Sequence, residues 1–381
     1  GVLKEMIGYA DQPDDKKAGT LLDHLELSIS YCLDNRGPHG LPLIGHADWN
    51  DCLNLNCFSR EPNESFQLAG HGANDKVAES VMIAGLFLYG SDLLAELYDH
   101  LGKPSDAARI RDGYAAIMKA VDAFGWDGAW FRRAYDAFGN PVGSAQNKEG
   151  KIFIESQGWC ILGGAGIRDG RARKALDSVH EHLYFEHGCV LQQPAYSEYH
   201  LELGEVTSYP PGYKENAGVF CHNNPWIQFA LMKLGDGDRA FEYYLSICPA
   251  AKEDMIDTYR AEPYVYSQMI AGKDAAKPGE AKNSWLTGCA AWTFLTVSQG
   301  FCGIQPDYQG LRLDPCIPSD WPEFKVTRQF RGATYQITVK NPRGKNRGIN
   351  QLSVNGTIIK GQVIPLAKPG TTCVVEANLE G

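Results

Sequence analysis

The chain has 381 residues, of which 44% are hydrophobic and 22% charged, and its formal net charge at pH 7 is −10. This length allows two hydrophobic cores, since domains contain about 100–200 residues each. The negative charge argues against nucleic acid and anionic membranes as partners, although a local cluster of donors can still bind a small anion. No apolar run reaches the roughly 20 residues that cross a bilayer, and the sequence, which starts with Gly1, shows no signal peptide. We therefore expect a cytoplasmic protein that is a piece of something longer.

The eleven cysteines form no CxxC pair, and most of them lie among apolar neighbours. Such a pattern predicts buried free thiols in a reducing compartment. A zinc site requires clustered Cys and His side chains. Cys221–His222 is the only adjacent pair of Cys and His in the sequence, so we predict no metal site.

Apolar residues recur at helical spacing along most of the first 300 residues. Helices are predicted over residues 18–34, 74–102, 104–124, 170–184, 217–234, 238–247 and 283–299. The loops between them are long, aromatic and rich in Gly and Pro, and long loops in a compact domain are usually functional. Paired helices with loops gathered at one end predict a mainly α domain, an α/α toroid, over residues 1–303.

The hydrophobic pattern of the sequence changes from helical spacing to strand-like alternation near residue 304. Stretches such as FKVTRQFRGATYQITVKN and QLSVNGTIIKG alternate apolar and polar residues, and Asn355–Gly356 is a typical hairpin turn. We predict a small antiparallel β-sandwich domain over residues 304–381.

The stretch GHADWNDCLNLNCFS, residues 45–59, is a loop that combines acidic residues with a tryptophan. Asp48 or Asp51 could act as a general acid, with Trp49 as an apolar wall that binds a sugar ring and raises a carboxyl pKa by desolvation. The alternative is that one aspartate caps the next segment and Trp49 packs in the core.

A second polar loop is EVTSYPPGYKENAGVFCHNNPW, residues 205–226. Glu205, Tyr209 and Lys214 lie within ten residues of one another, and two prolines stiffen the backbone between them. The loop suits a ligand that must be oriented, or it is a solvated loop with one lysine salt bridge. His222 precedes a probable helix start, and the local sequence alone favours a place in the core.

Two further stretches carry candidate ligand-binding groups. Thr287 and Gly288 offer a hydroxyl and backbone N–H groups near a predicted helix start, which suits phosphate; the alternative is an ordinary N-cap by Asn283 or Ser284. Gln268 follows two tyrosines that plain packing would also explain. Neither a Walker A sequence nor GxGxxG is present, so nucleotide binding has no support.

Taken together, five stretches resemble the cellobiose phosphorylases of glycoside hydrolase family 94, and they occur in the same order. They are GHADWNDCLNLNCFS, VAESVMIAGLF, YPPGYKENAGVFCHNNPW, EPYVYSQMIAGK and KNSWLTGCAAW. The similarity runs from about residue 20 to the C-terminus. It implies an (α/α)₆ barrel followed by a β-sandwich-like domain, in agreement with the pattern of predicted elements.

The resemblance also implies roles for individual residues. Asp51 matches the general acid, Trp49 lines the subsite of the transferred sugar, and Asp48 orders the loop. The residues that match the subsite of the released glucose are Glu205, Tyr209, Lys214 and Gln268. The residues that match the phosphate-binding positions are His222, Thr287 and Gly288. His46 stands where relatives have an arginine.

The implied reaction is the reversible phosphorolysis of cellobiose to α-D-glucose 1-phosphate and D-glucose, with inversion. Phosphate is the nucleophile, so neither a metal nor an organic cofactor is expected. Members have a β-sandwich, a helical linker and the first part of the barrel before the matching region, so we expect an incomplete barrel here that depends on that missing half. We also expect a homodimer.

Three alternatives remain open from the sequence. The substrate could be cellodextrin, laminaribiose or N,N′-diacetylchitobiose, because acceptor pockets change with few substitutions. The protein could be an inverting glycosidase on the same barrel, with Glu205 or Glu215 as the base. It could also be a carbohydrate-binding fragment without activity.

Overall fold

The computed structural model describes residues 2–9, 18–67 and 77–380, and it divides the chain into two compact units. Unit 1 comprises residues 1–178 and 192–210, and unit 2 comprises residues 179–191 and 211–381. This division runs through the predicted helical region, so helices belong to both units. The predicted boundary at residue 304 stays a prediction.

Most helices of unit 1 lie within the predicted ranges, although α2 begins at Val81 because Glu79 and Ser80 form a short strand. The helices of unit 1 are α1 (Leu21–Asp34), α2 (Val81–His100), α3 (Pro104–Ala120), α4 (Ile154–Leu162) and the start of α5 (Arg171–His182). Their first residues explain where they begin: Thr20 and Asp23 form a capping box on α1, Ser80 caps α2, and Pro104 is the first residue of α3. Helix α4 was missed, and residues 74–76 of the predicted second helix lie outside the described residues.

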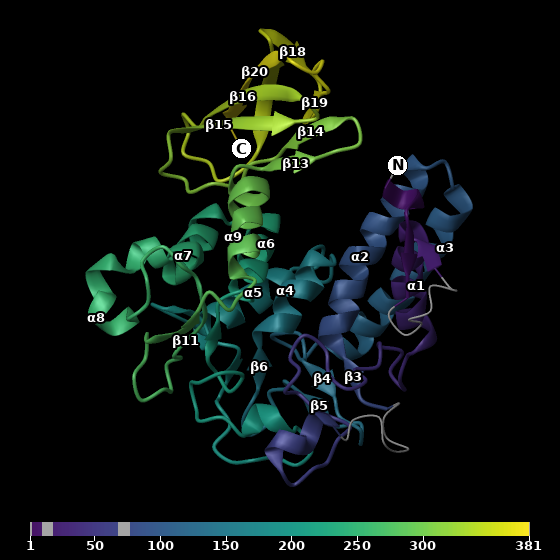
Figure 1. The fold of residues 1–381 in the computed structure, drawn as a ribbon, viewed down its shortest axis with the longest axis vertical. Coiled ribbons are helices and arrows are strands. Elements are labelled where there is room, and N and C mark those ends of the chain that lie inside the picture. Colours follow the sequence, from purple (N-terminus) through teal and green to yellow (C-terminus); the bar gives the residue numbers. More distant parts are fainter. Residues whose placement is uncertain (1, 10–17, 68–76, 381) are drawn as a thin grey trace. The chain divides into compact units, whose positions relative to one another are not determined.

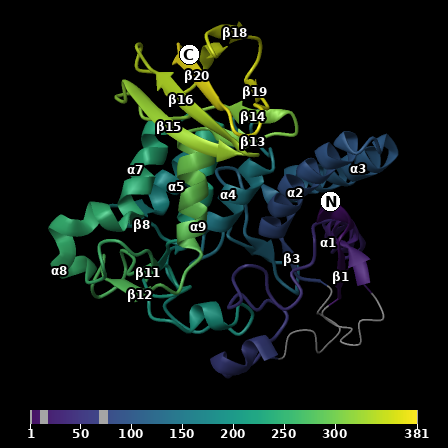
Figure 2. The same ribbon diagram turned by 45° about the horizontal axis from the view of Figure 1, so that its top comes forward.

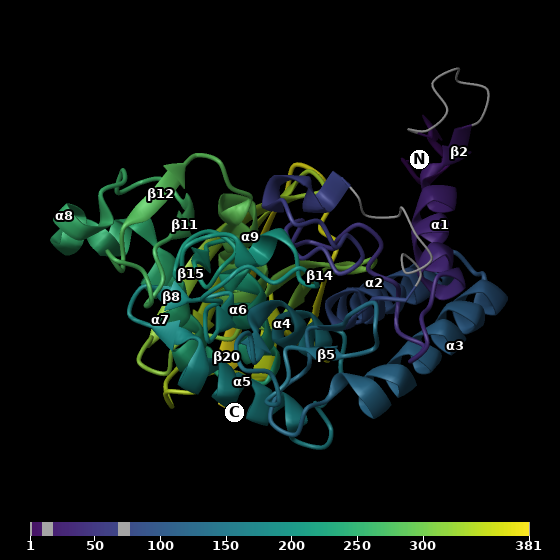
Figure 3. The same ribbon diagram turned by 90° about the horizontal axis from the view of Figure 1, so that it is seen from below.

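Helix α2 is the central helix of unit 1, and α1, α3 and α4 pack against it (Figures 1 and 3). A Cβ atom at Gly85 would lie 2.5 Å from the backbone nitrogen of Cys160, so only glycine permits the close approach of α2 and α4. By length and hydropathy α2 could cross a membrane, but 56% of its apolar window is buried within the structure. Core helices pass the same test.

Short strands in unit 1 connect the helices and hold its loops. They form three small sheets, β1 (Met6–Gly8) with β2 (Ala18–Thr20), β3 (Glu79–Ser80) with β4 (Ala134–Tyr135) and β5 (Pro141–Val142), and β6 (Ile152–Phe153) with β9 (Gln192–Gln193). The β4–β5 hairpin and residues 45–59 share one hydrophobic cluster, which includes Leu53, Leu55, Ala134 and Val142. This cluster anchors the loop that carries the predicted general acid.

Unit 2 continues the helical pattern and then becomes a β structure. Its elements before residue 304 are β7 (Tyr184–Phe185), β8 (Gly188–Cys189), β10 (Val219–Phe220), α6 (Asn224–Lys233), α7 (Gly237–Ile247), α8 (Ile256–Tyr259), β11 (Ser267–Ile270), β12 (Ala281–Ser284) and α9 (Cys289–Leu295). Helix α9 begins later than predicted, because Asn283 and Ser284 belong to strand β12. The proposed N-cap at either residue is therefore wrong, and the N-cap is Gly288.

The C-terminal strands of unit 2 form two sheets (Figure 2). One contains β13 (Ile304–Pro306), β14 (Gly310–Leu313) and β19 (Val363–Pro365); the other has the order β15 (Glu323–Phe330), β16 (Ala333–Lys340), β20 (Thr372–Leu379), β17 (Ile349–Val354) and β18 (Thr357–Ile359). The Asn355–Gly356 hairpin is confirmed, with positive φ at both residues. The prediction of a purely antiparallel domain is wrong at one ladder, because β16 and β20 pair in parallel. The barrel and the sandwich stay predictions.

Candidate active site

The acid loop, residues 45–59, leaves Asp51 exposed and anchors the residues around it. Cys52 and Leu53 are buried in the hydrophobic cluster of unit 1. The Asn54 side-chain amide donates to the Asp51 carbonyl at 2.9 Å, and the Asn54 backbone N–H donates to the Leu203 carbonyl at 2.9 Å. The backbone beside the predicted acid is thus fixed, while Asp51 itself is exposed and its Oδ1 accepts the Cys52 thiol at 3.5 Å.

A buried ionic cluster holds the start of the acid loop. The Arg133 guanidinium donates to both carboxylate oxygens of Asp48, at 2.5 and 2.6 Å, and the Ser80 hydroxyl donates to the same carboxylate at 2.7 Å. Glu155 Oε1 lies 3.7 Å from Arg133 Nε. The side chains of Arg133 and Glu155 are 0% exposed, and that of Asp48 is 1% exposed. We call Asp48, Ser80, Arg133 and Glu155 the clamp.

The clamp separates the proton affinities of its two carboxyl groups. Burial alone would raise the pKa of Asp48, but the Arg133 charge and the hydrogen bonds from Arg133 and Ser80 outweigh it, and the pKa is lowered. Burial raises the pKa of Glu155 to about 7, against the opposing effect of Arg133. One carboxylate therefore pairs with Arg133, and the other holds a proton more tightly than an exposed glutamate.

The clamp confirms part of what the motif resemblance implied. Asp48 orders the loop, since its carboxylate also accepts the Asn50 backbone N–H at 3.1 Å. The sequence interpretation missed Arg133 and Glu155, although the arginine pair in WFRRAYD lies in a predicted functional loop. Gly143, with φ of +77°, is required here, because a Cβ atom would lie 2.6 Å from the Arg133 backbone nitrogen.

Unit 1 also brings Glu205 and Tyr209 to the acid loop. The Tyr209 hydroxyl donates to Glu205 Oε1 at 3.3 Å and lies 3.9 Å from the Cys52 sulfur. The Glu205 backbone N–H donates to Asn54 Oδ1 at 3.2 Å. Burial raises the pKa of Glu205, the Tyr209 hydrogen bond lowers it, and the charge of Asp51 raises it further, with a net increase. Trp49, which is predicted to line the subsite of the transferred sugar, also lies in this unit and is half-buried.

Unit 2 contains the rest of the predicted set, and it pairs two of them directly. The Lys214 ammonium donates to Gln268 Oε1 at 2.9 Å, and the Asn283 side-chain amide donates to the same oxygen at 2.9 Å. Lys214 adopts a positive φ of 50°, which is uncommon for a lysine. Lys214 is half-buried, and the bond to Gln268 orients its ammonium group.

The predicted phosphate residues lie on segments that are bonded to each other in unit 2. The Cys221 backbone N–H donates to the Gln268 carbonyl at 3.0 Å, and the Cys289 thiol donates to the Cys221 carbonyl at 3.2 Å. Cys221 precedes His222, and Cys289 follows Thr287 and Gly288. The Thr287 hydroxyl accepts the Cys289 N–H at 3.1 Å. These bonds bring the two segments together.

His222 lies in an apolar, aromatic environment. Its ring makes edge-on contacts with Phe220 and Trp226, at centroid distances of 5.9 and 6.0 Å. Burial lowers the pKa of His222 to about 4, so the imidazole is neutral at pH 7. The side chain can offer a hydrogen bond to an anion, but it carries no charge of its own.

All eleven cysteines are free, as predicted, and Cys52, Cys221 and Cys289 are buried beside predicted site residues. Burial raises the pKa of Cys221 to about 12 and that of Cys289 well above the usual thiol value. The thiols of Cys221 and Cys289 are therefore not nucleophiles at neutral pH. They act as packing and hydrogen-bonding groups in the segments that hold His222 and Thr287.

The chain belongs to the glycosyl hydrolase 94 superfamily: residues 1–303 match the family described as "Glycosyl hydrolase 94 superfamily, catalytic domain". The N,N′-diacetylchitobiose phosphorylase of Vibrio proteolyticus is 36% identical over 97% of this chain and 43% of its own length. The solabiose phosphorylase of Paenibacillus borealis is 33% identical over 99% of this chain and 46% of its own length. The chain thus spans less than half of the length of these relatives.

A solved structure titled "Sialidase" has a similar fold. It matches 81% of this chain and 26% of its own length, with a TM-score of 0.54 and 13% sequence identity. At that identity the likeness concerns the fold alone.

Proposed function

We propose that the chain is the catalytic portion of an inverting disaccharide phosphorylase that acts on a β-linked sugar. The observation that carries the proposal is an exposed residue, Asp51, on an otherwise anchored loop, beside Glu205 and Tyr209. Membership in the glycosyl hydrolase 94 superfamily and similarity to two phosphorylases support it.

In this reaction Asp51 protonates the glycosidic oxygen as the bond to the anomeric carbon breaks. A phosphate oxygen forms the new bond to that carbon from the opposite face, which gives the α-sugar 1-phosphate and a free sugar. The proton that phosphate brings is released after the transfer and restores Asp51. Because phosphate is already anionic, no second carboxylate is required to activate it.

Two groups of residues divide the binding work in this proposal. Glu205, Tyr209, Lys214 and Gln268 bind the released sugar, with Trp49 against the transferred one. His222, Thr287 and Gly288 bind phosphate. A neutral His222 suits this role, because it donates a hydrogen bond and its pKa rises when the anion binds. The absence of any cofactor, a homodimeric state and a cytoplasmic location remain parts of the proposal.

The motif resemblance favours cellobiose as the substrate. A second candidate is N,N′-diacetylchitobiose, because the phosphorylase that carries this name is 36% identical over nearly the whole chain. The two sugars share the β linkage and differ in the substituent at carbon 2. Substrate choice is therefore decided by groups that contact that substituent.

A proton NMR time course tests the proposal. Cellobiose and N,N′-diacetylchitobiose are each incubated with the chain, with and without phosphate, and the anomeric signals are followed. Phosphate-dependent appearance of the α-sugar 1-phosphate is expected for one of the two sugars. Equal release of free sugar without phosphate would replace the proposal with an inverting glycosidase, for which Glu205 is a candidate base. Sugar binding without turnover would indicate a carbohydrate-binding fragment.

A further inference from the structure

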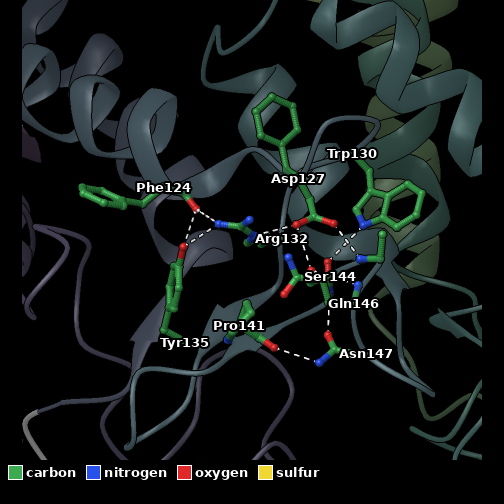
Figure 4. Close-up of polar contacts among 12 residues, drawn as sticks. Phe124, Asp127, Trp130, Arg132, Tyr135, Pro141, Ser144, Gln146 and Asn147 are labelled. Carbon is green, nitrogen blue, oxygen red and sulfur yellow. Dashed lines mark hydrogen bonds and ion pairs between the residues drawn. The ribbon is translucent and has the colours of Figure 1, made fainter.

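Asp51 lies between two anchor points of the acid loop. The first anchor is the clamp, whose Arg133 belongs to residues 124–147. A hydrogen-bond network connects these residues to one another (Figure 4), and in it Asp127 Oδ1 accepts from the Arg132 guanidinium at 2.8 Å. The start of the acid loop is therefore attached to a preformed scaffold.

The second anchor is Asn54, which is 0% exposed. Its side-chain nitrogen donates to the Asp51 carbonyl at 2.9 Å, and its side-chain oxygen accepts the Glu205 backbone N–H at 3.2 Å. Its own backbone N–H donates to the Leu203 carbonyl at 2.9 Å. One buried side chain therefore connects the backbone of the proposed acid with the backbone of a proposed sugar-binding residue.

The packing around Asn54 preserves this connection. Gly204 has a φ of +81°, and a Cβ atom there would lie 2.7 Å from Asn54 Cβ and 2.8 Å from Asn54 Oδ1. Glycine adopts this backbone conformation without strain and leaves room for the asparagine. The Val206 backbone N–H also donates to the Cys52 carbonyl at 2.8 Å. The acid loop and residues 203–206 are thus joined on both sides of Asn54.

The side chains of Asp51 and Glu205 are connected as well. The Cys52 thiol donates to Asp51 Oδ1 at 3.5 Å and lies 3.9 Å from the Tyr209 hydroxyl, which in turn donates to Glu205 Oε1 at 3.3 Å. Burial raises the pKa of Glu205 most, and the charge of Asp51 raises it further. The two carboxyl groups therefore interact, and a shift of one backbone relative to the other changes that interaction.

We propose that Asn54 is a positioning residue that holds the proposed general acid Asp51 at a fixed distance from Glu205, so that a sugar bound at Glu205 presents its glycosidic oxygen to the acid. The catalytic part of this inference rests on the proposed function, whereas the link between the two backbones does not. General acid catalysis requires heavy atoms about 2.6–3.2 Å apart, and a displacement of about 1 Å can cost about 10²-fold in rate. Asn54 acts through Asp51 and Glu205 and not on the substrate.

Hydrogen–deuterium exchange of the 381-residue chain, resolved to single residues, measures the link without any substrate. Asn54→Ala removes both side-chain bonds, so the Glu205 amide should exchange about tenfold faster or more. Asn54→Asp keeps an oxygen for this N–H and should retain most of its protection. Asn56→Ala is the matched control, because Asn56 is 6% exposed in the same loop but donates to the Gly45 carbonyl, at 2.8 Å. It should leave the Glu205 amide unchanged.

Kinetics in the synthetic direction measure the positioning role. The reactants are the free sugar and the α-sugar 1-phosphate of the disaccharide that the chain cleaves. Both Asn54 variants should lower kcat about ten- to a hundredfold relative to the unaltered chain. Asn54→Ala should also raise KM for the free sugar about two- to tenfold. Asn54→Asp should change this KM little, and neither variant should change KM for the sugar 1-phosphate.

The pH dependence of kcat separates positioning from a general loss of structure. Burial raises the pKa of a carboxyl group, and a protonated carboxyl group can again donate a hydrogen bond to the Asp51 carbonyl. In Asn54→Asp, kcat relative to the unaltered chain should therefore recover as the pH falls. Asn54→Ala, which has no such donor, should show no recovery.

Three results would overturn the inference. An unchanged Glu205 amide in Asn54→Ala, or an equal change in Asn56→Ala, would remove the link. Faster exchange with an unchanged kcat, or a kcat in Asn54→Asp that does not recover at low pH, would remove the positioning role and leave the proposed function intact. If the unaltered chain shows no phosphate-dependent turnover, the proposed function fails and the positioning role with it, while the exchange experiment still decides the link.

Discussion

The clamp in unit 1 and the surroundings of His222 in unit 2 accommodate buried titratable groups in opposite ways. In the clamp Arg133 pairs with Asp48 and lies near Glu155, so two opposite charges remain buried together. His222 has aromatic neighbours, and burial keeps it neutral. An ion pair of this kind fixes a loop whatever is bound, whereas a neutral imidazole leaves room for a charge that a ligand brings. The difference shows that the fold pairs one buried charge and keeps another buried titratable group neutral.

The largest expected effect is on kcat, and it follows from removal of the proposed general acid Asp51. Asp51→Asn removes the proton donor at constant size, and general acid catalysis contributes about 10²–10⁴-fold. We expect kcat for the natural disaccharide to fall by that factor, with an unchanged unfolding midpoint. Asp112→Asn, at an exposed position on α3, is the matched control.

A substrate with a better leaving group gives this prediction a second readout. A dinitrophenyl β-glycoside needs no protonation of its leaving oxygen, so the Asp51→Asn variant should lose much less activity on it. If both substrates lose activity equally, Asp51 acts in binding or folding and not as the acid.

The second largest expected effect is a decrease in the free energy of unfolding when the clamp loses its arginine. Arg133→Met leaves the carboxyl groups of Asp48 and Glu155 buried without their cation, and losing one partner of a buried ion pair costs about 3–5 kcal/mol. We expect a decrease of that size in the free energy of unfolding, measured with denaturant. Arg109→Met is the control: Arg109 is 45% exposed where it pairs with Glu26, and exposed pairs contribute about 0–1 kcal/mol. An equal decrease in the free energy of unfolding in both variants would show that the clamp does not stabilise the fold more than an exposed ion pair does.

The clamp also shows what the sequence could and could not predict. Periodicity placed α1, α3 and α7 closely, because each of these helices has an apolar pattern and a start signal. Helix α2 begins at Val81, after a short strand that the predicted helix over 74–102 had included. Helix α4 was missed because all nine of its residues are buried, including Glu155 and Gln157, so it has no polar face. The Asp48–Arg133 pair joins residues 85 positions apart, and local pattern gives no information on such contacts. The motif resemblance placed Asp51, Glu205 and Tyr209, which the fold of unit 1 does bring together.

The two buried groups should give pH dependences of opposite sign. The pKa of Glu155 is raised to about 7 in the folded state, so its stabilising contribution is complete below about pH 4.3, the unfolded value, and is lost as the pH rises to 7. The pKa of His222 is lowered to about 4, so its contribution is complete above about pH 6.5 and is lost as the pH falls to 4. Between about pH 4.5 and 6.5 the two effects oppose each other.

Single variants separate these effects. Glu155→Gln should make the free energy of unfolding rise more steeply with pH across this window, by at most about 1.4 kcal/mol per pH unit, and His222→Gln should make it rise less steeply. Chemical unfolding at several pH values measures both slopes, and if the two units unfold separately each change should appear in its own transition. Shifts of the same sign would show that one of the two pKa directions is wrong.

The smallest expected effect distinguishes the phosphate-binding role proposed for His222 from the sugar-binding role proposed for Lys214, both in unit 2. His222→Ala removes one hydrogen-bond donor to phosphate, a loss of about 1.5–3 kcal/mol for a charged partner, so KM for phosphate should rise about tenfold or more while KM for the disaccharide changes little. Lys214→Ala should instead raise KM for the acceptor sugar in the synthetic direction, because Lys214 and Gln268 share one hydrogen bond at 2.9 Å. Reversed patterns would exchange the roles of the two residues. The segments of both residues are joined by the hydrogen bond between Cys221 and Gln268. A common structural disturbance would therefore raise KM for phosphate and KM for the sugar in both variants. Binding roles are separated from packing only if each variant raises a different one of the two KM values.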